Sequence, residues 1–167
     1  MTASASRLPQ APWLASPFRP FYLLGAAYAP LVALGGAGAY VGIVELGGAG
    51  AVLLWHGHEM LFGFASAIVI GTLLTALPSW AGIAEVHGLR LAALVCAWLG
   101  GRGVMWAAPW LPPWMVAGAD LLLWLLVTAM LARPLWQLQD RRYRWLLPIM
   151  AGFVIANAAY HLAVIQG

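Results

Sequence analysis

Charged side chains are scarce in this sequence. Only 8% of its 167 residues are charged and 63% are hydrophobic, and the mean hydropathy is +0.87. A soluble domain carries roughly 25% charged residues, and a chain this short has too much surface to hide such an apolar excess in a water-facing core. The composition therefore excludes a soluble globular domain and a disordered chain. We expect the chain to lie in a lipid bilayer.

Lysine is absent and cysteine is nearly so. All eight basic residues are arginines, which give a formal net charge of +3 without forming a basic stripe, so we expect no nucleic-acid partner. The single cysteine, Cys96, cannot form an intrachain disulfide. Lysine chemistry of the Schiff-base kind is excluded, and the sequence holds no glycine-rich phosphate fingerprint. A soluble-enzyme function therefore has no residues to support it.

Long hydrophobic runs make up most of the sequence. A helix needs about 20 apolar residues to cross the hydrocarbon core, and the qualifying runs cover residues 21–44, 51–77, 89–108, 114–132 and 145–165. Pro78 and Pro134 are expected to stop the second and fourth runs. The strand alternation of a membrane barrel is missing. The sequence predicts an all-α fold, a polytopic membrane helix bundle of about five transmembrane helices in a single integral-membrane domain over residues 1–167.

The connections between these runs predict the orientation. Cytoplasmic loops accumulate arginine. In a five-span topology all loop arginines lie on one side: Arg7, Arg19, Arg90, Arg133, Arg141, Arg142 and Arg144. We therefore expect the N-terminus inside and the C-terminus outside. Tryptophans near span ends are expected as interfacial anchors, namely Trp55, Trp80, Trp110, Trp114 and Trp145.

Strongly polar residues within the spans collect at one level. At about 1.5 Å per residue, all of them fall in the outer half of the bilayer: His56, His58, Glu59, Arg102, Asp120, Asn157 and His161. A charge at membrane depth costs a few kcal/mol and usually marks a pathway, a ligand site or a buried pair. Contributions from four helices at one depth predict a shared, histidine-lined pocket, as in bundles that hold cofactors.

Two interpretations are open for most of these residues. In one interpretation, Arg102 and Asp120 form a salt bridge with each other that locks two helices. In the other, Arg102 binds an anionic group of a cofactor. Asn157 is expected to make an interhelical hydrogen bond. His56 and His58 lie about 200° apart on a regular helix, so both cannot point at one metal.

The histidines are candidate metal ligands. One histidine of the second span and His161 suit the two axial positions of a planar iron macrocycle, opposed across the bundle. Glu59 would orient one imidazole through its second nitrogen. The alternative for each histidine is a hydrogen-bonded residue that only packs helices.

A resemblance to a known family rests on particular strings. The run Trp55-His-Gly-His-Glu-Met-Leu-Phe-Gly-Phe64, the run Leu73-Leu-Thr-Ala-Leu-Pro-Ser-Trp-Ala-Gly82 and the entry Ser16-Pro-Phe-Arg-Pro-Phe-Tyr22 resemble the signature of the NnrS family. Weaker similarities are Gly101-Arg102, Arg141-Arg-Tyr-Arg144, and Asn157 with His161. The first string is specific, since it is improbable by chance in an apolar helix.

The resemblance implies a cofactor and a function. The family consists of multi-pass proteins of the bacterial inner membrane that contain haem and copper and are linked to nitric oxide metabolism and nitrosative stress. It implies a metalloprotein with His56, His58 and His161 at family-like positions, and a redox partner.

The chain is short for that family, whose usual members continue into a second half with more helices. The resemblance therefore implies an N-terminal half or a short member, with a second half or a second copy of the chain as partner. Two other functions stay open beside it. One is a structural or assembly subunit whose polar residues only lock helices, and the other is a transporter-like subunit.

Overall fold

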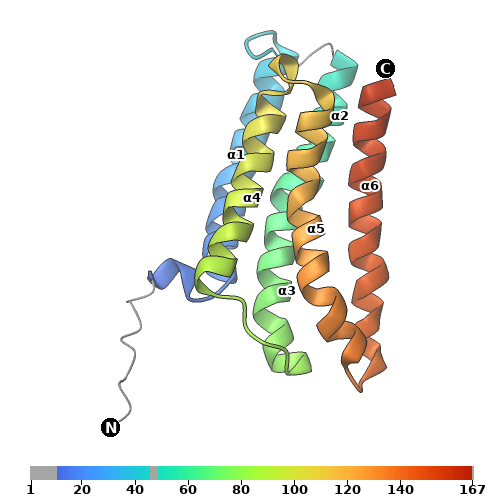
Figure 1. Ribbon diagram of the computed structural model, residues 1–167. Coiled ribbons are helices and arrows are strands. Elements are labelled where there is room, and N and C mark those ends of the chain that lie inside the picture. The colour runs from blue at the N-terminus through green and yellow to red at the C-terminus, as the bar shows by residue number, and fades with distance from the viewer. Residues whose placement is uncertain (1–10, 46–48, 167) are drawn as a thin grey trace.

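The computed structural model describes residues 11–45 and 49–166, and within these residues the chain forms a helix bundle without strands (Figure 1). Five helical segments are long and apolar enough to cross a membrane: Phe18–Tyr40, Ala51–Ala81, Gly88–Trp106, Pro113–Gln137 and Arg141–Gln166. The predicted all-α fold class and the number of spans are confirmed. Arg7 lies outside the described residues.

The helices follow one another up and down the bundle. The long ones are α1 (Phe18–Tyr40), α2 (Ala49–His58), α3 (Ser66–Ala81), α4 (Gly88–Trp106), α5 (Pro113–Gln137) and α6 (Leu146–Gln166). A π-helical segment, η2 (Glu59–Ala65), joins α2 to α3, so that the second span is one continuous helix with a wide turn inside it. Short 3₁₀ helices are η1 (Pro12–Leu14), η3 (Ala108–Trp110) and η4 (Arg141–Trp145).

Packing arranges the spans in two sets, the first span against the second and the last three against one another. Helix α1 packs against α2, η2 and α3, whereas α4 packs against α5 and α5 against α6. The start of α1 and the end of α6 lie at opposite ends of the bundle (Figure 1). Lipid tails are as apolar as leucine, so close van der Waals packing and interhelical hydrogen bonds hold such helices together. Phe21, Ile70, Leu77 and Trp124 are almost completely buried in this packing.

The two prolines expected to stop spans lie inside helices instead. Helix α3 continues past Pro78 to Ala81, and α5 continues past Pro134 to Gln137. Proline removes a single backbone donor, and membrane-spanning helices tolerate it where neighbouring groups satisfy the freed carbonyl. Helix α3 ends at Gly82, whose φ of +66° suits glycine and lets its N–H donate to the Pro78 carbonyl at 3.0 Å.

The tryptophans expected at the membrane interface divide into two groups. Trp80, Trp110, Trp114 and Trp145 are each at least 59% exposed, as interfacial anchors must be. Trp55 is only 4% exposed, so its prediction as an anchor is wrong. Its indole Nε1 donates to the Met105 carbonyl at 3.3 Å and joins the second span to α4.

Candidate metal centre

The π-helical segment begins at Glu59, directly after His58. It lies where the second span turns these two polar side chains toward the inside of the bundle. His58 and its neighbour Glu59 are 4% and 0% exposed. The two side chains meet inside the bundle, where His58 Nδ1 lies 3.0 Å from Glu59 Oε1. Neighbours on a regular helix point about 100° apart, and π-helical turns are frequent at functional sites. This local widening is the element that sequence periodicity did not predict.

Glu59 is surrounded by donors from three directions. Arg102 Nη1 donates to Glu59 Oε1 at 2.6 Å, and the Tyr28 hydroxyl donates to Glu59 Oε2. Trp106 Nε1 in turn donates to the Tyr28 hydroxyl at 2.9 Å. A carboxylate held in this way is fixed in position, because each of its oxygens has a donor of its own. Tyr28 and Trp106 were not predicted as part of the site; a phenol or an indole N–H buried in a span usually needs a polar partner.

Arg102 links the two acidic residues of the spans. Its guanidinium is ion-paired with Asp120 through Nη2 and with Glu59 through Nη1. The arrangement depends on the close approach of α4 and α5, since a Cβ on Gly101 would stand 3.3 Å from the Asp120 Cα. The salt bridge with Asp120, one of the two interpretations of Arg102, is present. The guanidinium faces both carboxylates, in a setting where an unpaired charge would be costly.

Asp120 also joins the two histidines. Its Oδ2 atom lies 2.9 Å from His161 Nε2 and 3.1 Å from His58 Nε2. The expected interhelical hydrogen bond of Asn157 is present too, since its Oδ1 lies 2.8 Å from His58 Nε2. His58, Asp120 and His161 are all buried, and one potential ligand atom of each lies within 4.8 Å of the other two. Three spans thus bring together three side chains of types that can bind a metal ion.

Aromatic rings enclose this point. Tyr160 stacks on the His58 ring with centroids 4.1 Å apart, and Phe62 lies 4.9 Å from the same ring. The rings of His58 and His161 are 5.5 Å apart and inclined at 69°. Tyr160 was not among the predicted residues, although it precedes His161 directly in the sequence.

His56 lies apart from this cluster. Its half-buried side chain sits against Gly36 of α1, and its Nδ1 is buried without a hydrogen-bond partner among the described residues. Six of the seven predicted polar residues therefore converge: His58, Glu59, Arg102, Asp120, Asn157 and His161. His56 is the residue that does not join them, because its side chain and that of His58 were expected to point in different directions from the helix.

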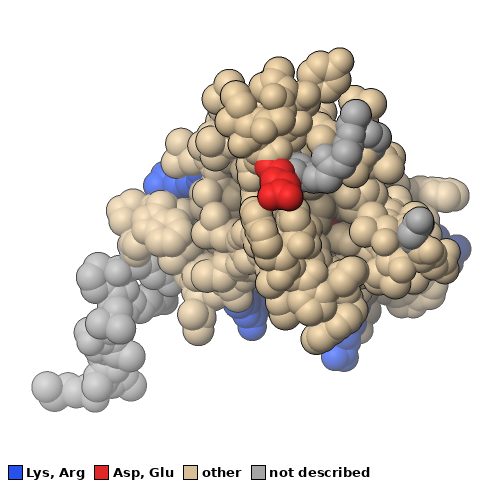
Figure 2. All heavy atoms as spheres, turned by 90° about the horizontal axis from the view of Figure 1, so that it is seen from above, with Lys and Arg blue, Asp and Glu red and all other residues tan. Residues whose placement is uncertain are grey.

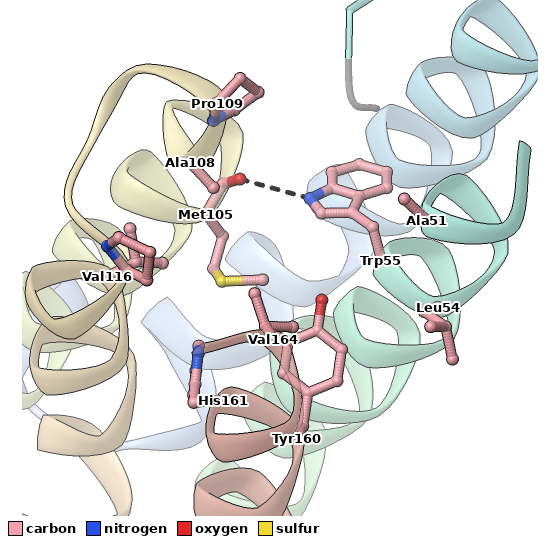
Figure 3. Close-up of a pocket in the computed structure, with 11 residues that line it drawn as sticks. Ala51, Leu54, Trp55, Met105, Ala108, Pro109, Val116, Tyr160, His161 and Val164 are labelled. Atoms are coloured by element: carbon pink, nitrogen blue, oxygen red, sulfur yellow. Dashed lines mark hydrogen bonds between the residues drawn. The ribbon is translucent and has the colours of Figure 1, made fainter. Parts of the chain in front are cut away.

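A cavity adjoins the cluster at the end of the bundle where α6 finishes. Its volume is about 270 Å³, and its walls come from α2, the end of α4, the start of α5 and α6. Figure 3 shows Trp55, Met105, Val116, Tyr160 and His161 facing this space from different helices. His161 thus belongs to the cluster and to the cavity wall.

Comparison with known proteins gives one match. The family described as NnrS protein matches residues 12–167. The chain belongs to the NnrS family. The NnrS match includes all four spans that supply the cluster, so the polar residues are part of the matched region. Neither the curated proteins nor the solved structures contain a significant match to the chain.

Proposed function

We propose that the chain is an integral membrane metalloprotein of the NnrS family that holds a transition-metal ion with His58, Asp120 and His161. The observation that carries this proposal is the convergence of these three side chains, all buried, from three different spans. Two imidazoles and a carboxylate are a donor set that suits iron or copper. Copper is the ion that the family resemblance implies.

The surroundings of His58 fit a cation at its Nε2 atom. The Glu59 carboxylate lies at Nδ1 and the Asp120 carboxylate lies at Nε2, so acceptors face both nitrogens of the ring. A metal ion at Nε2 would take the place of a proton there. Nδ1–H would then donate to Glu59, which is the usual way in which a ligating histidine is oriented.

The charge of the cluster also favours a cation. Glu59 and Asp120 carry two negative charges, and Arg102 supplies one positive charge between them. With neutral imidazoles the group is negatively charged inside the bundle, where uncompensated charge is expensive. A bound metal cation would offset this excess of one negative charge and would supply redox chemistry at the centre.

A haem between His58 and His161 fits less well than an ion. Axial ligation by both rings needs a flat slot between them, wide enough for the macrocycle. Tyr160 and Phe62 pack directly on the His58 ring, and the adjoining cavity of about 270 Å³ is below the roughly 300–1,000 Å³ of drug-sized ligand sites. We therefore derive no role for haem at this pair of histidines.

We propose a role in nitric oxide metabolism or in the response to nitrosative stress, and a place in the bacterial inner membrane, because the family resemblance implies both. We propose the orientation with the N-terminus inside because the described arginines, other than Arg102, lie at the end of the bundle where α1 begins: Arg19, Arg90, Arg133, Arg141, Arg142 and Arg144. Seen from the opposite end, arginines appear only at the outline of the molecule (Figure 2). The metal centre then lies toward the outer face.

Metal content of the purified protein tests the proposal. In detergent-extracted protein, we expect bound copper or iron in the wild type and its loss in His58→Ala and His161→Ala, because each removes a ligand. His87→Ala, in an exposed loop, is the matched control and should keep the metal. Circular dichroism would establish that the variants remain helical. Helical wild-type protein without metal after copper or iron supplementation would contradict the proposal.

A second candidate function rests on the pairing of the same groups. Glu59, Arg102, Asp120 and Asn157 connect α2, η2, α4, α5 and α6 by hydrogen bonds and ion pairs, so they also lock helices without any cofactor. A purely structural subunit is the function favoured if the metal analysis is negative while Arg102 proves essential for folding.

A further inference from the structure

One amide side chain, that of Asn157, is buried beside the proposed centre. It lies on α6 one turn before His161, so the two side chains share one face of that helix. Its exposed fraction is 0%, and its Nδ2 is buried without a hydrogen-bond partner among the described residues. An unpaired buried donor destabilises a folded chain, so this amide is expected to have a role beyond joining two helices.

The oxygen end of the amide faces the donors of the centre. Asn157 Oδ1 lies 2.8 Å from His58 Nε2, and Asp120 Oδ2 lies 3.1 Å from the same nitrogen. A single hydrogen on Nε2 makes one well-directed hydrogen bond, whereas a cation attracts both oxygens at once. A cation bound at this nitrogen would therefore have two oxygens beside it, one from a carboxylate and one from an amide.

The spacing of these atoms is that of neighbouring ligands of one ion. Bonds of about 2.0 Å place adjacent ligand atoms about 2.8–3.3 Å apart. The distance is 2.8 Å from Asn157 Oδ1 to His58 Nε2, 3.1 Å from that nitrogen to Asp120 Oδ2, and 2.9 Å from Asp120 Oδ2 to His161 Nε2. Four donor atoms from α2, α5 and α6 thus follow one another at the spacing of ligands.

We propose that the amide oxygen of Asn157 is a fourth protein ligand of the metal centre, which then has two nitrogen and two oxygen donors. The inference rests on the proposed function, since it adds a ligand to the ion held by His58, Asp120 and His161. A helix presents two ligands four residues apart to one ion, as in helical zinc motifs with histidines at that spacing. Nitrogen and oxygen donors suit copper(II), and a neutral amide adds no charge to a cluster that already holds two carboxylates.

Isotope labelling tests this ligand in the wild-type protein. Asn157 is the only asparagine in the sequence, so labelled asparagine reports on this residue alone. Cell-free synthesis with asparagine that carries ¹³C at its side-chain carbonyl keeps the label out of aspartate. After copper(II) loading in detergent, we expect electron–nuclear double resonance to show an isotropic ¹³C coupling, which requires a bond between the amide and the copper. Protein labelled at the side-chain carbonyl of glutamine is the control and should show no such coupling.

The outcomes of this measurement separate the inference from the proposed function. Imidazole nitrogen couplings without an isotropic ¹³C coupling from asparagine would overturn the inference and leave the proposed function standing. Protein that binds no copper would overturn both, and its metal content would show this directly.

Two substitutions at Asn157 give an independent measure, with circular dichroism to establish folding. Asn157→Leu keeps a similar volume but removes the oxygen, and we expect copper(II) affinity to fall about tenfold or more. Asn157→Asp returns an oxygen donor and should restore binding, whereas a residue that only packs helices would gain an unfavourable buried charge. Gln166→Leu, at an exposed position of α6, is the control and should leave affinity unchanged. Wild-type affinity in folded Asn157→Leu protein, or no recovery in Asn157→Asp, would overturn the inference.

Discussion

Replacing Arg102 with alanine is expected to destabilise the bundle by about 3–5 kcal/mol, the cost of removing one partner of a buried ion pair. The reason is that Glu59 and Asp120, which are 0% and 3% exposed, would lose the guanidinium that lies between them. Like charges left together in a low-dielectric region repel, and neither can reach water. Thermal unfolding of the metal-free protein in detergent, followed by circular dichroism, measures the effect.

The control for this prediction is an exposed arginine in the first turn of α4. Arg90→Ala removes an exposed side chain and should change stability by less than about 1 kcal/mol. A variant that also neutralises both acids, with Arg102→Met, Glu59→Gln and Asp120→Asn, should recover part of the loss because no buried charge is left unpaired. Equal unfolding temperatures for the wild type and Arg102→Ala would show that the ion pairs do not hold the helices.

Glu59→Gln is expected to lower metal affinity about 10–100-fold, the usual effect of removing a group that orients a ligating histidine. Glutamine has the shape of glutamate, so its carbonyl can still accept from Arg102 and the packing is kept. The negative charge that strengthens the Nδ1–H hydrogen bond of His58 is lost, and the imidazole becomes a weaker ligand. Competition with a chelator of known affinity measures the change.

Glu85→Gln is the matched control, since Glu85 is an exposed glutamate of a loop. It should leave metal affinity unchanged. Because Asp120 remains paired with Arg102 in the Glu59→Gln variant, the helices are expected to stay together, and circular dichroism distinguishes weak binding from unfolding. If folded Glu59→Gln protein bound the metal with wild-type affinity, Glu59 would have no role in orienting the ligating histidine.

Much of the fold can be predicted from the sequence because the bilayer limits the choices. A span needs about 20 apolar residues, and this length alone predicts five helices. Their ends are less predictable, since Pro78 and Pro134 lie within helices whose ends are set by local backbone geometry at Gly82 and Leu138. Trp55 illustrates another limit: an indole near the end of an apolar run can anchor at the interface or pack inside, and only the position of α4 decides between them.

The members of the cluster are predictable for a different reason. Ionisable residues within spans rarely face lipid, so the sequence predicts that most of them meet, although the same argument includes His56, which lies against α1 instead. Their individual contacts are not predictable, because the π-helical turn after His58 changes which way Glu59 points. Tyr28 and Trp106 are missed because they belong to residue types that are also common in apolar packing and at the interface.

Electron paramagnetic resonance of the copper(II)-loaded protein tests most directly whether the two histidines and Asp120 form a metal centre. We predict nitrogen couplings from the imidazoles of both His58 and His161, unchanged in His56→Ala because His56 lies against α1. In the His161→Ala variant, the spectrum should lose the nitrogen coupling of one imidazole, or the protein should no longer bind copper. A copper spectrum without imidazole nitrogen, or one altered by His56→Ala and not by His161→Ala, would contradict the account.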